Sequence, residues 1–249
     1  MAENAKKNNK NQVKKSNIIS LEKKNISKLK KEVEDLKKLH KETCEMAARS
    51  ILHALDLKDH YTFGHSTRVA FFSLALGKEM GLGEQELYDL EMASLFHDIG
   101  KIGIPDSILL KSVRLNYEEF KVMSTHPEKS AEILKEFKGF EMIAKCAKHH
   151  HERFDGKGYP DGLKGEDIPL FSRIILISDT FDAMTSTRTY RKGLGYDVAF
   201  KELQDFAGSQ FDPKLVELFI KAISKDRDKD STGMFNLTII KGDFIKNAA

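Results

Sequence analysis

Side chains that could bind metal ions are spread through the middle of the chain. Seven of them stand in contexts typical of metal ligands: His65, His97, Asp98, His126, His150, His151 and Asp179. Imidazoles and carboxylates together suit Fe, Mn, Zn or Ni, and the absence of thiolates argues against a structural zinc site. Each histidine taken singly is better explained as a surface residue or a hydrogen-bonded core residue. The whole set favours one shared metal centre around the pair His97-Asp98.

A centre of this kind suits the hydrolysis of phosphodiesters. Two ions about 3.5–4 Å apart lower the pKa of a shared water and clamp the phosphate. Lys101, one turn after His97, would add positive charge where the transition state needs it; a solvent-facing lysine is the alternative. Arg188 and Arg191 follow Asp179 and are spaced to share a face of a helix end. Forked guanidinium groups suit phosphate oxygens, although surface salt bridges would also explain these two arginines.

Helices are the elements expected to position these residues. Apolar residues recur at helical spacing in 69–76 and in 84–97. Asn116 with Glu119 resembles a capping box, and Asp212-Pro213 is typical of an N-cap followed by proline at the first helical position. These signals predict several separate helices.

Two short runs, 174–177 and 237–240, are rich in the residues that strands prefer. The first leads directly into the segment 179–184, so a buried helix suits it better than a strand. The chain contains no internal repeat. The sequence therefore predicts an all-α fold.

The N-terminal part of the chain differs from the rest. Residues 1–17 are rich in Lys and Asn, which favours a disordered basic arm. Residues 18–45 predict an amphipathic helix with a short heptad seam formed by Ile19, Ile26, Leu29, Val33 and Leu36. β-branched residues at a and Leu at d are typical of a parallel two-stranded coiled coil. A homodimer through residues 19–40 and a helix that packs on its own domain are both consistent with this pattern.

Composition and charge restrict the class of protein. A chain of 249 residues with 40% hydrophobic and 32% charged residues can form a globular core. Residues 1–40 carry twelve lysines against five acids, so a net charge of +3 leaves about −4 for the remainder. This distribution argues against nucleic acid as a partner of the folded part. The chain shows no membrane span and no signal peptide, and its two cysteines fit buried thiols, so a cytoplasmic location is expected.

Longer motifs resemble the HD-GYP family of the HD phosphohydrolases. The matching segments are 61–69, 97–106, 126–127, 150–160 and 173–191, and they follow the family's order between about Leu55 and Phe219. The resemblance implies a helical bundle of the HD-domain type, placed at residues 46–222, with residues 223–249 left as a tail of unknown role. It also implies hydrolysis of cyclic di-GMP to linear pGpG, with the end product, pGpG or GMP, left open.

The resemblance also assigns roles to residues. The seven candidates named above would be metal ligands, with Asp98 bridging two ions, usually iron or manganese. Some members of the family hold a third ion through a glutamate four residues before the first histidine. Tyr61 occupies that position here, so two ions are expected, although Asp56 and His60 lie close by. Asp59 would orient the nucleophilic water or accept its proton.

Further expectations concern the substrate and partners. By resemblance, Lys101, Arg188 and Arg191 would contact the phosphates of cyclic di-GMP. The Gly158-Tyr159-Pro160 loop would shape the site and contact a partner, such as a diguanylate cyclase. Two alternatives stay open: a catalytically weak module that binds the nucleotide or a partner, and a hydrolase of another nucleotide, such as cyclic GMP-AMP or a guanosine polyphosphate.

Overall fold

The structure is a computed structural model that describes residues 22–40, 42–43, 46–47, 50–51, 60–187 and 192–227, with the backbone alone at 60–63 and 226–227. Several expectations lie outside the described residues. They concern Asp59, Arg188, Arg191, the side chain of Tyr61, the arm at 1–17 and the segment 237–240. These expectations stay predictions.

The chain divides into two units, Met1–Ser50 and Ile51–Ala249. In the first unit, residues 22–40 form a continuous helix whose side chains are all exposed. The predicted seam residues Ile26, Leu29, Val33 and Leu36 are 49–64% exposed. The helix therefore presents an apolar stripe along one face.

The second unit is helical, which confirms the predicted all-α fold. No strand occurs among its described residues, where an isolated bridge joins Ala207 to Phe211. Its elements are α2 (His60–Glu79), α3 (Glu84–Phe96), η1 (Ile99–Gly103), α4 (Asp106–Leu109), α5 (Tyr117–Met123), α6 (His126–Lys135), α7 (Glu141–Lys148), η2 (Gly165–Asp167), α8 (Leu170–Thr185), α9 (Tyr196–Asp205) and α10 (Pro213–Arg227).

The predicted helix starts are present. The Asn116 side chain accepts a hydrogen bond from the Glu119 main-chain N–H, and the Glu119 carboxylate accepts one from the Asn116 main-chain N–H. Pro213 is the first residue of α10, and the Asp212 carboxylate accepts a hydrogen bond from the Lys214 main-chain N–H at 3.0 Å. The β-like run 174–177 lies inside α8 and is buried. Its aliphatic side chains belong to the core, because α8 is buried along much of its length.

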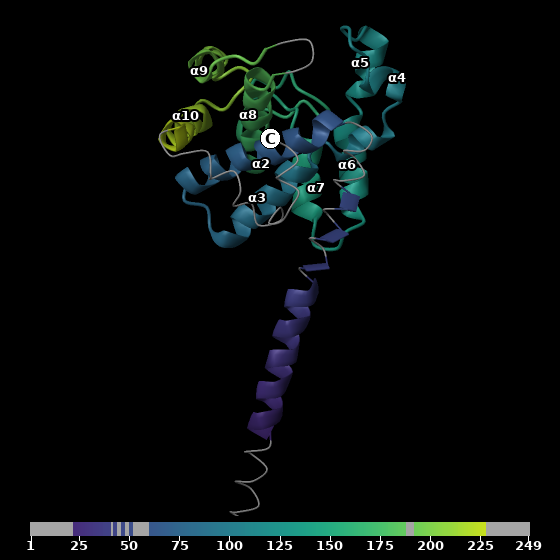
Figure 1. The fold of residues 1–249 in the computed structure, drawn as a ribbon, viewed down its shortest axis with the longest axis vertical. Helices are drawn as coiled ribbons and strands as arrows, with labels where there is room; N and C mark the ends of the chain where they lie inside the picture. The colour runs from purple at the N-terminus through teal and green to yellow at the C-terminus, as the bar shows by residue number, and fades with distance from the viewer. Residues whose placement is uncertain are drawn as a thin grey trace, which may run out of the picture. The chain divides into compact units, whose positions relative to one another are not determined.

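The core fixes the helices that carry the site (Figure 1). Helix α2 packs against α3, α8 and α10, and α6 packs against α7 and η1. The rings of Phe72, Phe181 and Phe219 meet edge to face, with centroids 5.1 Å apart for the Phe72–Phe181 and Phe181–Phe219 pairs. In Figure 1, α9 and α10 lie to one side of α8, and α4 and α5 lie to the other side. This aromatic cluster holds α2 and α8 in a fixed relation.

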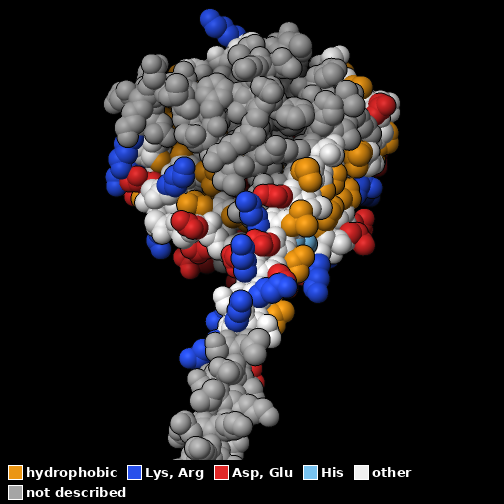
Figure 2. Space-filling model, turned by 60° about the horizontal axis from the view of Figure 1, so that its bottom comes forward, with side chains coloured by type: hydrophobic (Ala, Val, Ile, Leu, Met, Phe, Trp, Pro, Cys, Tyr) orange, Lys and Arg blue, Asp and Glu red, His pale blue; other side chains and the backbone are white. Residues whose placement is uncertain are grey.

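The surface of the described residues mixes charges of both signs. Figure 2 shows Lys and Arg side chains interspersed with Asp and Glu side chains on the visible face. None of the described helices combines the length and apolar character needed to cross a bilayer.

Candidate metal centre

The pair His97-Asp98 lies at the end of α3, and both side chains are buried. The Nδ1 of His97 lies 2.6 Å from the main-chain oxygen of Ser94. Because a carbonyl can only accept, Nδ1 is the protonated nitrogen and Nε2 keeps its lone pair. That Nε2 lies 3.3 Å from Asp98 Oδ2, so it faces the carboxylate.

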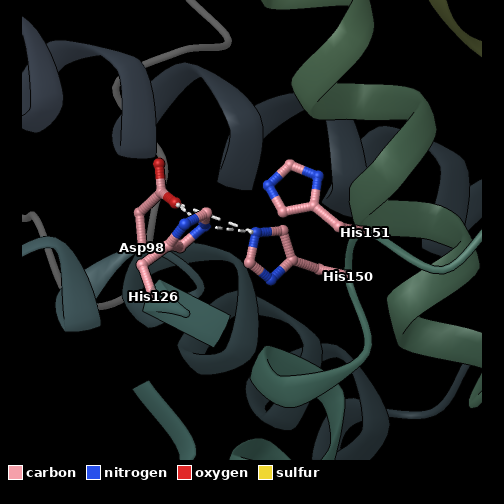
Figure 3. A group of neighbouring side chains, drawn as sticks. All are labelled: Asp98, His126, His150 and His151. Carbon is pink, nitrogen blue, oxygen red and sulfur yellow. Dashed lines mark hydrogen bonds and ion pairs between the residues drawn. The ribbon is translucent and has the colours of Figure 1, made fainter. Parts of the chain in front are cut away.

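His126 and His150 repeat this arrangement from two other helix ends. The Nδ1 of His126 donates to the Met123 carbonyl at 2.7 Å, and the Nδ1 of His150 donates to the Ala147 carbonyl at 2.6 Å. Their Nε2 atoms lie 3.1 and 3.7 Å from Asp98 Oδ1. Figure 3 shows the imidazoles of His126, His150 and His151 close together on one side of Asp98. Three helix ends therefore direct imidazole lone pairs at one carboxylate.

His65, on α2, is oriented by a side chain instead of a carbonyl. Its Nδ1 lies 2.7 Å from Asp182 Oδ2, on α8. Its Nε2 lies 3.2 Å from Asp179 Oδ1 and 3.8 Å from Asp98 Oδ2. The Asp182 carboxylate also accepts hydrogen bonds from Arg68 at 2.5 and 3.1 Å. Sequence reasoning gave Arg68 and Asp182 no role, although each lies three residues after a predicted ligand.

His151 is held by an aromatic ring. Tyr159 stacks on it with centroids 4.9 Å apart and planes at 24°, and the rings of Phe120 and Tyr159 meet edge to face with centroids 6.0 Å apart. Asp161 anchors the loop that carries Tyr159, because its carboxylate accepts a hydrogen bond from the Lys148 amine at 2.6 Å. The predicted loop thus forms one wall of the centre.

A close contact between η1 and α6 sets Asp98 against His126. The Ser130 hydroxyl donates to the His97 carbonyl and accepts from the Gly100 main-chain N–H, both at 2.8 Å. A Cβ atom on Gly100 would lie 2.1 Å from the His126 main-chain oxygen. Only glycine therefore permits this approach of the two backbones.

The charges of the centre follow from burial and contact. Burial raises the pKa of Asp98, but the positive charge of Lys101, with its Nζ 2.5 Å from Oδ2, and contacts with the imidazoles hold that pKa well below its usual range. Burial also opposes ionisation of Asp179, yet the hydrogen bond from His65 lowers its pKa. Burial lowers the pKa of His150, and that of His151 to about 3. Both carboxylates are therefore charged and both of these imidazoles neutral at pH 7.

His65 differs from the other imidazoles in its pKa. Burial lowers the pKa of His65, but hydrogen bonds to Asp179 and Asp182 and the charge of Asp98 raise it to about 9. An imidazole among three carboxylates is a strong base, and a cation on its Nε2 would replace the proton there.

The donor set fits divalent cations. His97 Nε2 and Asp98 Oδ1 are buried without a hydrogen-bond partner, an arrangement that is costly unless another group satisfies them. Two groupings have converging ligand atoms, one of Asp98, His126, His150 and His151 and one of His65, His97 and Asp98. Separations of 3.1–3.8 Å between their atoms compare with about 3.3 Å between tetrahedral ligands placed about 2.0 Å from one ion. The shared Asp98 suits a bridge between two ions.

The structure brings all seven predicted ligands to one place, and Lys101 with them.

Comparisons with known proteins agree on the family. An HD-domain family model matches residues 16–215. A cyclic di-GMP phosphodiesterase of Thermotoga maritima is 37% identical over 186 residues, 71% of this chain and 50% of that protein. A 3'3'-cGAMP-specific phosphodiesterase of Vibrio cholerae is 37% identical over 183 residues, 73% of this chain and 35% of that protein.

A solved structure agrees on the fold. The crystal structure of a cyclic GMP-AMP-specific phosphodiesterase of V. cholerae superposes with a TM-score of 0.57 at 24% identity, over 74% of this chain and 49% of that one. The present chain spans about half the length, or less, of the curated relatives described above. Its matched residues nevertheless include every helix from α2 to α9, and the chain belongs to the HD-domain family.

Proposed function

We propose that the chain is a metal-dependent phosphodiesterase that hydrolyses cyclic di-GMP to linear pGpG, with the end product, pGpG or GMP, left open. The observation that carries this proposal is the pair of largely buried ligand groupings that share the ionised Asp98. A relative of 37% identity that is named a cyclic di-GMP phosphodiesterase supports the substrate.

The seven ligands would hold two ions. His65, His97 and Asp179 would bind one, His126, His150 and His151 the other, and Asp98 would bridge them. Iron or manganese suits this donor set of nitrogen and oxygen atoms. The bound ions would supply an acidified water and a clamp for the phosphate. Tyr61 at the position of a third-ion carboxylate keeps the proposed count at two.

Lys101 would act beside the ions. Its amine contacts Asp98, and its side chain is 24% exposed, so the lysine is next to the proposed ions without being fully buried. There it would stabilise negative charge on a phosphate oxygen in the transition state. Asp59 as the residue that orients the water, and Arg188 and Arg191 as phosphate contacts, belong to the same proposal.

Two other functions make different demands on the same site. Hydrolysis of cyclic GMP-AMP is supported by the cGAMP-specific relative, which is as similar to this chain as the cyclic di-GMP enzyme. The metal ligands meet only the phosphate and do not distinguish the bases. A binding module without catalysis would be expected to have lost ligands, whereas the chain retains all seven.

Turnover by metal-loaded protein tests the proposal. Protein loaded without oxygen with Fe(II) or Mn(II) is expected to convert cyclic di-GMP to pGpG, followed by chromatography, faster than it converts cyclic GMP-AMP. Asp98→Asn should abolish turnover, because an amide cannot bridge two cations as a carboxylate does. Asp205→Asn, on an exposed residue of α9, should leave it unchanged. Tight binding of cyclic di-GMP without turnover under Fe, Mn, Ni or Zn would refute the enzymatic proposal.

We also propose that the 22–40 helix pairs with a second copy in parallel. In the heptad that places Ile26 and Val33 at a, Glu32 falls at g and Lys37 at the following e position. These opposite charges face each other across a parallel dimer and not across an antiparallel one. A Leu29→Asp variant that sediments as the wild type does would contradict the dimer.

Two further expectations stay predictions. They are a diguanylate cyclase as partner of the Gly158-Tyr159-Pro160 loop and a cytoplasmic location.

A further inference from the structure

Asp182 stands out because it contacts a proposed ligand yet has no oxygen left for a metal. Its Oδ2 lies 2.7 Å from His65 Nδ1 and 3.1 Å from an Arg68 amine. Its Oδ1 accepts from Arg68 Nε and, at 2.9 Å, from the Ser186 hydroxyl. The residue is fully buried. Its position behind the imidazole is therefore fixed from three sides.

His65 depends on this contact in a way that the other imidazoles do not. The Nδ1 atoms of His97, His126 and His150 donate to main-chain carbonyls three residues earlier. Those acceptors belong to the helix ends and stay in place when side chains are exchanged. His65 lies within α2, and the acceptor of its Nδ1 is a side chain on α8, so a single substitution can remove that acceptor.

The chemistry of a carboxylate acceptor strengthens this role. A carboxylate behind a ligand imidazole fixes the tautomer, sets the ring orientation and makes the other nitrogen more basic. Arg68 donates to both oxygens of Asp182, and the Ser186 hydroxyl donates to one of them. The group behind His65 is thus a carboxylate held in place by a forked guanidinium.

We infer that Asp182, held by Arg68, is a positioning residue that directs His65 Nε2 at the cation site shared with His97, Asp98 and Asp179. It would thereby set the affinity of that site alone. This inference rests on the proposed two-ion centre. Only one of the two ions should be affected, because the described contacts of Asp182 do not include His126, His150 or His151.

Asp182→Asn tests the inference. An amide oxygen can accept from His65 or from Arg68, but the amide nitrogen then turns a donor toward the other group. The affinity of the His65 site should fall about 10–100-fold, the range found for such supporting residues, while the second site keeps its affinity. Mn(II) binding to the full chain, measured by equilibrium dialysis and by electron paramagnetic resonance, reports each site. The exchange-coupled signal of a pair should give way to the six-line signal of one isolated Mn(II).

Asp212→Asn is the matched control. Asp212 is also buried and accepts from an arginine, Arg173, at 2.6 Å, but it touches no proposed ligand. Asp212→Asn should bind two Mn(II) ions as the wild type does. Arg68→Lys, which keeps a positive charge but loses the fork, gives a milder variant and should weaken the same site by a smaller factor. If circular dichroism shows that Asp182→Asn does not fold, Arg68→Lys tests the inference in its place.

The double variant His65→Ala/Asp182→Asn shows whether Asp182 acts through His65. If it does, the double variant binds Mn(II) no more weakly than His65→Ala alone. Equal weakening of both sites, unchanged affinities in Asp182→Asn, or the same loss in Asp212→Asn would each overturn the inference. A wild type that binds only one Mn(II) would refute the two-ion proposal instead. The inference would then be judged by whether Asp182→Asn weakens that single ion.

Discussion

Gly100→Ala is the smallest change that should separate the two halves of the metal centre. The new Cβ would lie 2.1 Å from the His126 main-chain oxygen and 2.4 Å from the Ser130 main-chain nitrogen. Real Cβ atoms essentially never approach another atom closer than 3.0 Å, so the two backbones must separate by roughly 1 Å. Asp98 immediately precedes η1 and His126 begins α6. The separation therefore acts directly on two proposed ligands, whose atoms lie 3.1 Å apart.

Two effects of this change can be given a size. Overpacking of a well-packed interior costs about 1–3 kcal/mol, and loss of the hydrogen bond from the Gly100 N–H to Ser130 adds about 1 kcal/mol. The free energy of unfolding should thus fall by about 2–4 kcal/mol. Because a misplacement of about 1 Å can cost about 10²-fold in rate, turnover of cyclic di-GMP should fall at least that far in molecules that are still folded.

Gly103→Ala provides the control within the same short helix. There the new Cβ would meet Lys129 Cδ at 3.0 Å, and the end of a lysine side chain can move away. Urea unfolding would give the loss of stability, and initial rates at saturating Mn(II) would give the loss of activity. If Gly100→Ala matches Gly103→Ala in both measurements, then the close approach of η1 and α6 does not position the site.

Other substitutions test other parts of the centre. Ser130→Ala leaves a buried amide of η1 without its acceptor and should lower the free energy of unfolding by about 1–3 kcal/mol, measured in urea. Tyr159→Ala removes the ring stacked on His151 and should weaken Mn(II) binding, whereas Tyr159→Phe keeps the stack and should bind Mn(II) nearly as the wild type does. Burial raises the pKa of Cys146 to about 12, so in a Cys44→Ser background its thiol should react with Ellman's reagent at pH 8 only after unfolding; rapid reaction of the folded protein would contradict its burial.

The sequence predicted the helices well where periodicity or capping signals were present. Asn116 with Glu119 and Asp212 with Pro213 determine helix starts through contacts that span three residues or fewer, so a local pattern suffices. The run 174–177 was ambiguous by composition, since strands and buried helices both use aliphatic residues. Because the run continues directly into the segment 179–184, a helix was predicted, and the structure confirms this helix as part of α8.

The sequence indicated the candidate ligands that the structure brings together, but not the contacts that support them. Residue types and long motifs indicated all seven candidates, because metal ligands need particular side chains. The partners of their Nδ1 atoms carry no such signature. A carbonyl behind His97 could be any residue's, and the Asp182–His65 contact joins positions 117 residues apart. The spacing of Asp182 from Asp179 and of Arg68 from His65 was the available signal, and it acquires meaning only once α2 and α8 are known to pack together.

The carbonyls behind three of the imidazoles explain how helices alone can assemble this centre. Ser94, Met123 and Ala147 lie in the last turns of α3, α5 and α7, where carbonyls lack partners within the helix. A histidine just beyond each helix end satisfies one such carbonyl through Nδ1 and turns its Nε2 lone pair away from the helix.

The same geometry makes the place attractive to cations. The C-terminal end of a helix carries the negative end of its dipole, and the imidazoles that follow these three helix ends converge on the ionised Asp98. Positive charge placed there interacts favourably with three helix ends as well as with Asp98 and Asp179. His65, inside α2, has no free carbonyl to use, and this is why its support had to come from a side chain on a neighbouring helix.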